Sequence, residues 1–162
     1  MDSKKITFAI DSNLRDVSLI GLSINKICSQ IPLSDVEVYQ IEACVVEAIN
    51  NTIEHAYQNT TGHRVEVDVD LYLDRIAFKV SDTGLSMDPA VSPSLDFDPE
   101  DLDKLPEGGM GLFIIHQVMD QVAYCTANGK NTLEMTKNFG PHPLLDGHTD
   151  PHQAPSASPH PG

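Results

Sequence analysis

The stretch Glu47-Ala48-Ile49-Asn50-Asn51-Thr52-Ile53-Glu54-His55 decides how this chain of 162 residues is interpreted. It lies in a run with helical periodicity, and Glu47, Asn51 and His55 follow one another at intervals of four residues. Four residues are slightly more than one helical turn, so the three side chains are expected to share one helix face. A carboxylate and an amide one turn apart can accept a proton and bind a metal ion. An ordinary solvated helix face has the same spacing, so other motifs must decide between the two interpretations.

Capping residues and hydrophobic periodicity predict the elements around this stretch. We expect a strand at 6–10, a helix from Leu14 to Ser29, and a longer helix from Ser34 or Asp35 to about Tyr57. Strands at 64–71 and 75–81 follow, and the first of them alternates valines with acidic residues, which predicts one buried face.

The second half of the chain begins with a long irregular, proline-containing region from Leu85 to Pro106. A helix is expected at 111–121, and strands at 122–127 and 132–137 are joined by the turn residues Asn128-Gly129. This order of elements predicts an α/β fold. It is a two-layer α+β sandwich with a mixed, mostly antiparallel sheet and helices on one face.

Composition predicts one domain, residues 1–139, followed by a disordered tail, residues 140–162, rich in Pro and His and without Lys or Arg. The formal charge of −14 argues against direct binding of nucleic acid, whose backbone requires clustered cations. No apolar run approaches the roughly 18 residues of a membrane span, so no membrane contact is expected. Three cysteines without a CxxC motif suit a reducing cytosol, and we expect a cytoplasmic protein.

A glycine motif, Gly108-Gly109-Met110-Gly111-Leu112, stands at the start of the later helix. Glycine lets the backbone approach phosphate closely, and the free N–H groups of a helix start point to the same place. Lys104 is the only cation near the motif in sequence. The phosphates of ATP would therefore be held mainly by N–H groups and a divalent metal ion. A flexible turn without a ligand has the same glycines.

Asp82-Thr83-Gly84 follows the strand at 75–81 and offers a second contact for a nucleotide. A buried carboxylate can accept a hydrogen bond from the exocyclic amine of adenine, whereas guanine presents a carbonyl there. A simple turn after a strand is the alternative. Asn51 could give an oxygen to Mg²⁺, and Glu47 could take the proton of an incoming hydroxyl during transfer of a γ-phosphoryl group.

Taken in this order, the motifs resemble the GHKL-type ATP-binding domain shared by proteins such as gyrase, histidine kinases and MutL. The resemblance covers most of residues 5–138 and is closest to the free-standing anti-sigma serine kinases of bacterial partner-switching systems. It is carried by the segments 46–57, 80–84, 86–89, 107–115 and 119–120.

This resemblance implies an ATP-dependent serine/threonine-protein kinase that also acts as an anti-sigma factor and phosphorylates a small antagonist protein on serine. It implies that Glu47 is the catalytic base, that Asn51 is the Mg²⁺ ligand, and that a lid at about 85–106 covers ATP. A sigma factor and a second copy of the chain, forming a homodimer, are further implied partners. The implied nucleotide-binding residues are Asn51, Asp82, Gly84, Lys104, Gly108, Gly109, Met110, Gly111, Leu112 and Thr132.

The sequence departs from the family pattern at two places. Ser86 replaces the second glycine of the D-x-G-x-G form, a change that the kinase branch tolerates. Pro106 and Glu107 stand where some relatives carry an arginine able to reach the γ-phosphate. This second departure leaves another hypothesis open, a nucleotide-gated protein-binding module without phosphoryl transfer.

Overall fold

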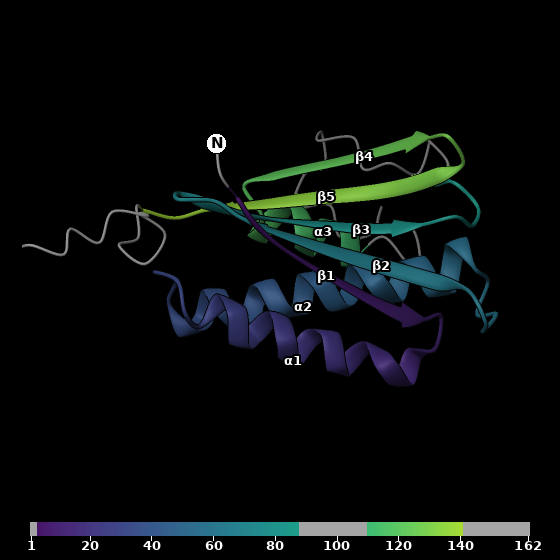
Figure 1. The fold of residues 1–162 in the computed structure, drawn as a ribbon, viewed down its shortest axis with the longest axis horizontal. Coiled ribbons are helices and arrows are strands. Elements are labelled where there is room, and N and C mark those ends of the chain that lie inside the picture. Colours follow the sequence, from purple (N-terminus) through teal and green to yellow (C-terminus); the bar gives the residue numbers. More distant parts are fainter. Residues whose placement is uncertain (1–2, 88–109, 141–162) are drawn as a thin grey trace, which may run out of the picture.

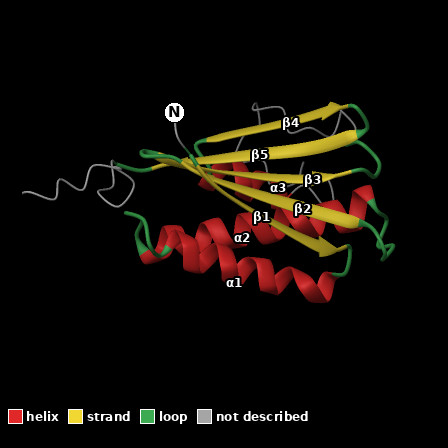
Figure 2. Cartoon of the chain, in the orientation of Figure 1, coloured by secondary structure: helices red, strands yellow, loops and turns green. Residues whose placement is uncertain are grey.

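The computed structural model describes residues 3–87 and 110–140, which form one sheet with helices on one of its faces (Figure 1 and Figure 2). The five strands have the order β1-β2-β3-β5-β4. They are β1 (Lys4–Asp11), β2 (Arg64–Leu71), β3 (Arg75–Asp82), β4 (Gln121–Ala127) and β5 (Lys130–Asn138). The helices are α1 (Val17–Cys28), α2 (Asp35–Asn51) and α3 (Met110–Val118), with short helical turns η1 (Leu14–Asp16) and η2 (Thr52–Ala56). The predicted two-layer architecture is confirmed, whereas nearly all of the expected lid and tail lies outside the described residues.

Every pairing among the described strands is antiparallel, so this part of the sheet is not mixed. The hairpin of α1 and α2 returns the chain to the end of the sheet that it left, and β2 therefore runs antiparallel to β1. β3 and β4 run in the same direction, but β5 lies between them and pairs with both. The connection through α3 therefore passes over the position that β5 occupies. Because β5 separates them, β3 and β4 are not parallel neighbours.

Helix α2 has a defined start and an unusual end. Ser34 Oγ accepts the Glu37 N–H at 3.2 Å while the Glu37 carboxylate accepts the Ser34 N–H at 2.8 Å, which forms a capping box. After Asn51 the chain continues as η2, a π-helical turn, so the expected helix to Tyr57 is divided into two segments. Turns of this kind are rare and occur often at functional sites. Glu47 and Asn51 are half-buried, whereas His55, beyond the change of helical register, is exposed.

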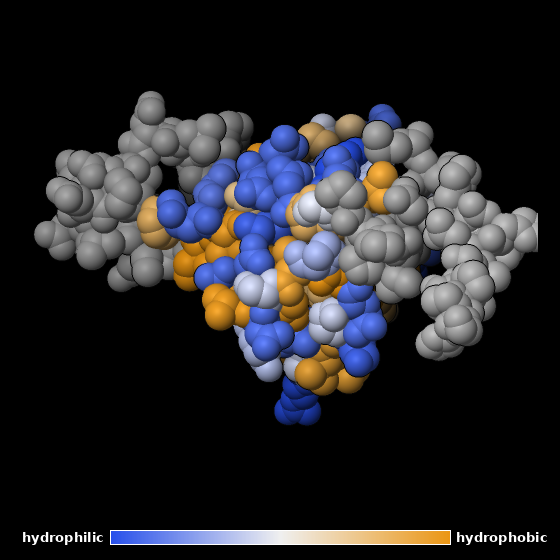
Figure 3. Space-filling view, turned by 90° about the vertical axis from the view of Figure 1, so that its left-hand side faces the viewer, coloured by the Kyte–Doolittle hydropathy of each residue, from blue (hydrophilic) through white to orange (hydrophobic). Residues whose placement is uncertain are grey.

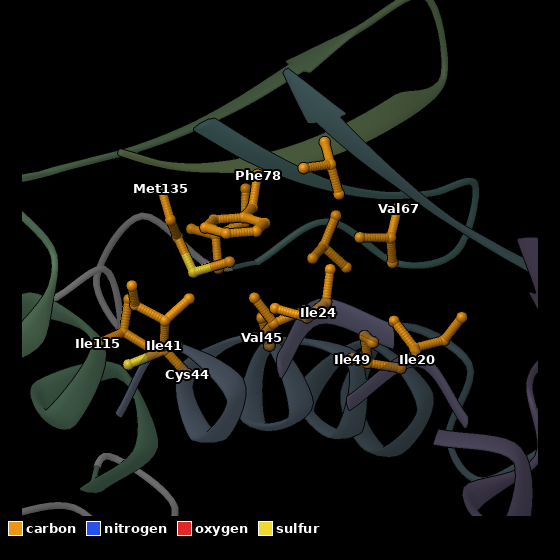
Figure 4. Packing of buried hydrophobic residues seen from close by; sticks show 14 of the residues in the cluster. Ile20, Ile24, Ile41, Cys44, Val45, Ile49, Val67, Phe78, Ile115 and Met135 are labelled. Atoms are coloured by element: carbon orange, nitrogen blue, oxygen red, sulfur yellow. The ribbon is translucent and has the colours of Figure 1, made fainter. Parts of the chain in front are cut away.

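The hydrophobic core lies between the helices and the sheet (Figure 4). Val67 and Phe78 of the sheet face Ile41, Val45 and Ile49 of α2, and each of these side chains is at most 1% exposed. α2 also packs against α1 on one side and α3 on the other. Because tightly packed side chains restrict movement, α2 is a rigid support for the polar residues on its remaining face.

The outer side of the helix layer carries exposed hydrophobic side chains. Leu19, Leu22 and Tyr39 are 60%, 66% and 68% exposed. At the end of the molecule seen in Figure 3, hydrophobic and hydrophilic areas alternate between the grey regions. None of the described helices is both long enough and apolar enough to cross a membrane.

Candidate functional site

The first part of the candidate site is the contact between α2 and the start of α3. Gly111, in the first turn of α3, is buried and lies against the Glu47 side chain. A methyl group placed on Gly111 would lie 2.5 Å from both Cγ and Cδ of Glu47 and would overlap its carboxylate. The φ angle of Gly111 is not positive. This glycine is therefore required by space, since it lets the backbone of α3 approach the carboxylate on α2.

A double-mutant cycle tests this contact. Gly111→Ala is expected to lower the free energy of unfolding by about 1–2 kcal/mol, because the Glu47 side chain must move to a less favourable rotamer. In the Glu47→Ala background the added methyl group has room, so we expect Gly111→Ala to cost much less there. Urea unfolding of the four proteins measures the coupling, and Gly140→Ala, at an open position, is the neutral control. Equal losses in both backgrounds would contradict the described contact.

The second part of the site is the segment after β3, which packs on the C-terminal end of the α2–η2 segment. A methyl group on Gly84 would lie 2.7 Å from the carbonyl carbon of Ala56 and 2.9 Å from Cδ1 of Tyr57. The adjacent Leu85 N–H donates to the Ala56 carbonyl at 2.9 Å. Gly84 therefore allows the turn after Asp82 to lie directly on the residues that follow Asn51.

Asp82 is a buried carboxylate with one oxygen fully engaged. Its Oδ1 accepts the Gly84 N–H at 2.9 Å and Asn131 Nδ2–H at 2.8 Å, and its residue exposure is 7%. Burial raises the pKa of the Asp82 carboxyl, and the two hydrogen bonds oppose this shift. No described residue donates to Oδ2, so this oxygen can accept a hydrogen bond from a ligand.

Asn131 is the central polar residue of this region, and the sequence interpretation missed it. Its Nδ2 donates to Asp82 and to the Gly84 carbonyl at 3.1 Å, while its Oδ1 accepts hydrogen bonds from Ser86 Oγ at 3.1 Å and Thr126 Oγ1 at 2.9 Å. It is 1% exposed and lies opposite Asp82 in the β3–β5 ladder. A signal was present, because extending the alternation of buried Met135 and Leu133 by one step places Asn131 on the inner face.

Thr132, which the resemblance implies as a nucleotide-binding residue, lies on the opposite face of the sheet from Asp82 and Asn131. Neighbouring residues of a strand point to opposite faces, and Asn131 occupies the inner position. Thr132 is paired with Ser81, and the two hydroxyl groups are 3.1 Å apart. The expectation for Thr132 is corrected on this geometry, and Asn131 takes its place beside Asp82.

The remaining predicted site residues fall into two groups. Lys104, Gly108 and Gly109 lie outside the described residues. Met110 begins α3, and the side chain of Leu112 is part of the hydrophobic core, with 9% exposure. Leu112 can therefore contribute to a ligand site only through its backbone. The structure brings Glu47 to Gly111, and it brings Asp82 and Gly84 to the end of the segment that contains Asn51.

The chemistry of these groups fits a nucleotide with a hard metal ion. Asn51 and Glu47 offer oxygen atoms from one helix, which is the ligand type that Mg²⁺ prefers. The start of α3 supplies N–H groups beside them, and these favour negative charge. Asp82 offers a buried acceptor at a separate point, which suits an amine of a base.

Comparison with known proteins gives the class to which this architecture belongs. Residues 10–137 match the histidine kinase-like ATPase domain, and the chain belongs to this family. Two similar proteins are both named serine-protein kinase RsbW. The one from Listeria innocua is 31% identical over 137 residues, covering 82% of this chain and 86% of that protein. The one from Staphylococcus aureus is 32% identical over 144 residues, covering 85% and 89%.

A solved structure supports the fold independently. It is the SiaB-SiaC complex from Pseudomonas aeruginosa, with a TM-score of 0.58 and 14% sequence identity over 83% of this chain and 89% of the matched chain. At this level of identity the likeness shows the shared fold alone.

Proposed function

We propose that this chain is an ATP-dependent serine/threonine-protein kinase that acts as an anti-sigma regulatory factor and phosphorylates a small antagonist protein on serine. The observation that carries the proposal is the close approach of Gly111 to the Glu47 carboxylate, because it brings a potential base to the N-terminus of α3. Membership of the ATPase family and the names of the two similar kinases support the same function.

Each group has a defined role in this proposal. Glu47 accepts the proton of the serine hydroxyl as that oxygen bonds to the γ-phosphorus and the bond from the γ-phosphorus to the bridging oxygen breaks, which releases ADP. Asn51 provides a neutral oxygen ligand for Mg²⁺, which neutralises phosphate charge when it is bound. Oδ2 of Asp82 accepts a hydrogen bond from the adenine amine, with Asn131 fixing the carboxylate. Gly84 and the 108–112 segment complete the nucleotide site, and Lys104 is an added cation.

The proposed partner is a small antagonist protein with an acceptor serine, and a sigma factor is a second one. The exposed Leu19, Leu22 and Tyr39 give the helix layer apolar surface that a protein partner can cover. We also propose a cytoplasmic location and a homodimer, both from the resemblance to the anti-sigma kinases.

A nucleotide-gated binding module is the second candidate function. It is favoured by Pro106 and Glu107, which occupy the place of the arginine found in some relatives. In that case ATP would change partner affinity through different contacts in two conformations, without chemistry.

The two candidates are separated by a phosphorylation assay. The protein is incubated with Mg²⁺ and γ-labelled ATP and with a candidate small antagonist protein from the same organism, both as wild type and with its acceptor serine changed to alanine. A kinase labels only the wild-type antagonist. Saturable ATP binding without any labelling would favour the binding module.

A further inference from the structure

Tyr57 lies directly after η2 and connects three parts of the chain. The residue is 6% exposed, and its ring stacks on His63 with centroids 4.7 Å apart and an interplanar angle of 7°. Its hydroxyl donates to the Arg64 carbonyl at 2.7 Å and accepts the Thr83 N–H at 2.9 Å. One oxygen atom thus joins the start of β2 to the turn that follows Asp82.

The backbone N–H groups of Thr83, Gly84 and Leu85 all donate hydrogen bonds. Two of the acceptors lie at the end of the α2–η2 segment. Thr83 N–H donates to Tyr57 Oη, and Leu85 N–H donates to the Ala56 carbonyl at 2.9 Å. Between them, Gly84 N–H donates to the Asp82 carboxylate. The segment 82–85 is therefore held by residues that follow Asn51 in the chain.

This arrangement fixes two distant halves of the site relative to each other. Asn51 immediately precedes η2, Ala56 is the last residue of η2, and Tyr57 follows it. The end of the site proposed to bind adenine, at Asp82, is thereby connected to the end proposed to bind phosphate, at Asn51. The connection consists of backbone atoms and a single side-chain hydroxyl.

We propose that Tyr57 is a positioning residue for the nucleotide. Its hydroxyl group holds the Asp82–Leu85 segment in place relative to Asn51. The inference rests on the proposed use of Asp82 and Asn51 in ATP binding. Without Oη, the Thr83 N–H loses its acceptor while the aromatic ring still fills its place. The segment then has more freedom, and ordering it on binding weakens nucleotide affinity.

Tyr57→Phe tests the hydroxyl alone. We expect the Kd of Mg²⁺-ATP, measured by calorimetry well below the melting temperature, to rise about 5- to 20-fold, in the range of one lost hydrogen bond. The affinity for ADP, measured with EDTA, should fall by a similar factor, since the effect is at the adenine end of the site and does not involve the metal ion. In a turnover assay the KM for ATP should rise while kcat at saturating ATP stays close to wild type.

Two matched variants make the test specific. Tyr39→Phe removes a hydroxyl from a side chain on α2 that is 68% exposed, and it should leave the Kd unchanged. His63→Ala removes the stacked ring but keeps the Tyr57 hydroxyl, and it should change the Kd by no more than about twofold. A loss of ATP affinity in His63→Ala as large as that in Tyr57→Phe would assign the effect to packing and overturn the proposal.

The remaining outcomes are also distinct. If wild-type protein binds ATP and Tyr57→Phe binds it equally well, the positioning role is overturned while the proposed function stands. If wild-type protein does not bind ATP, the proposed function itself fails. If Tyr57→Phe melts too low for calorimetry, Gly84→Ala displaces the same segment through its overlap with Ala56, and unchanged ATP affinity in that variant would overturn the proposal.

Discussion

Asn51→Ala is expected to reduce phosphoryl transfer by about 10²- to 10³-fold and to remove most of the dependence of ATP affinity on Mg²⁺. The phosphate chain of ATP carries several negative charges, and the protein itself has a formal charge of −14. Among the described lysines and arginines, six form ion pairs with acidic residues outside the site. The metal ion must therefore offset much of the phosphate charge, and Asn51 is its protein ligand in the proposal.

Glu47→Gln separates catalysis from binding in the same experiment. It should lower the transfer rate by about 10²- to 10⁴-fold with little change in ATP affinity, because the base acts only in the chemical step. Asn50→Ala is the matched control, as Asn50 is the preceding, half-buried asparagine of the same helix, about 100° away around its axis. Full transfer activity in Asn51→Ala, or equal losses in Asn50→Ala and Asn51→Ala, would contradict the assignment.

Asp82→Asn is expected to weaken ATP binding by about 10²-fold or more and to reduce the preference for ATP over GTP. An asparagine oxygen can still accept the hydrogen bonds from Gly84 and Asn131, so its amide group must take the position of Oδ2. That amide would meet the adenine amine, and two donors cannot form a hydrogen bond. The guanine carbonyl, in contrast, can accept from it.

The same substitution should leave the unliganded protein at least as stable as the wild type. Burial raises the folded-state pKa of Asp82, so the charged form destabilises the folded protein once the pH rises through that pKa. Removing the charge removes this cost, and the free energy of unfolding near pH 7 should stay equal or increase. Asp74→Asn, at an exposed turn, is the control for both measurements. Unchanged ATP affinity in a folded Asp82→Asn protein would show that the carboxylate does not contact the base.

Much of the fold followed from local signals in the sequence. The capping residues before α2 predicted where that helix begins, and the alternating valines of β2 predicted that strand with its observed bounds. The sheet was predicted to be mostly antiparallel, but the strand order was not predicted, because the place of β5 between β3 and β4 depends on long-range pairing that no local pattern contains. The π-helical turn η2 was missed for a related reason, since the packing of 82–85 on its end is a tertiary contact.

The candidate site was predicted in its parts and less well in its arrangement. Glu47 and Gly111 were both identified, but the expected reason for the glycine was phosphate binding, whereas the structure shows that Gly111 makes room for Glu47. Thr132 was chosen from the family resemblance, and the last strand was predicted to begin at Thr132, whereas β5 begins at Lys130. This boundary error of two residues left Asn131 outside the predicted strand, so its position opposite Asp82 was not predicted.

The proposed function requires that ATP is held by backbone N–H groups, Asp82 and a magnesium ion. Calorimetric titration of the full chain with ATP, repeated with EDTA in place of Mg²⁺, tests it directly. We expect saturable binding of ATP with Mg²⁺ and binding that is at least about tenfold weaker with EDTA. Folded protein that shows no saturable binding at millimolar ATP, by calorimetry and by equilibrium dialysis, would contradict it.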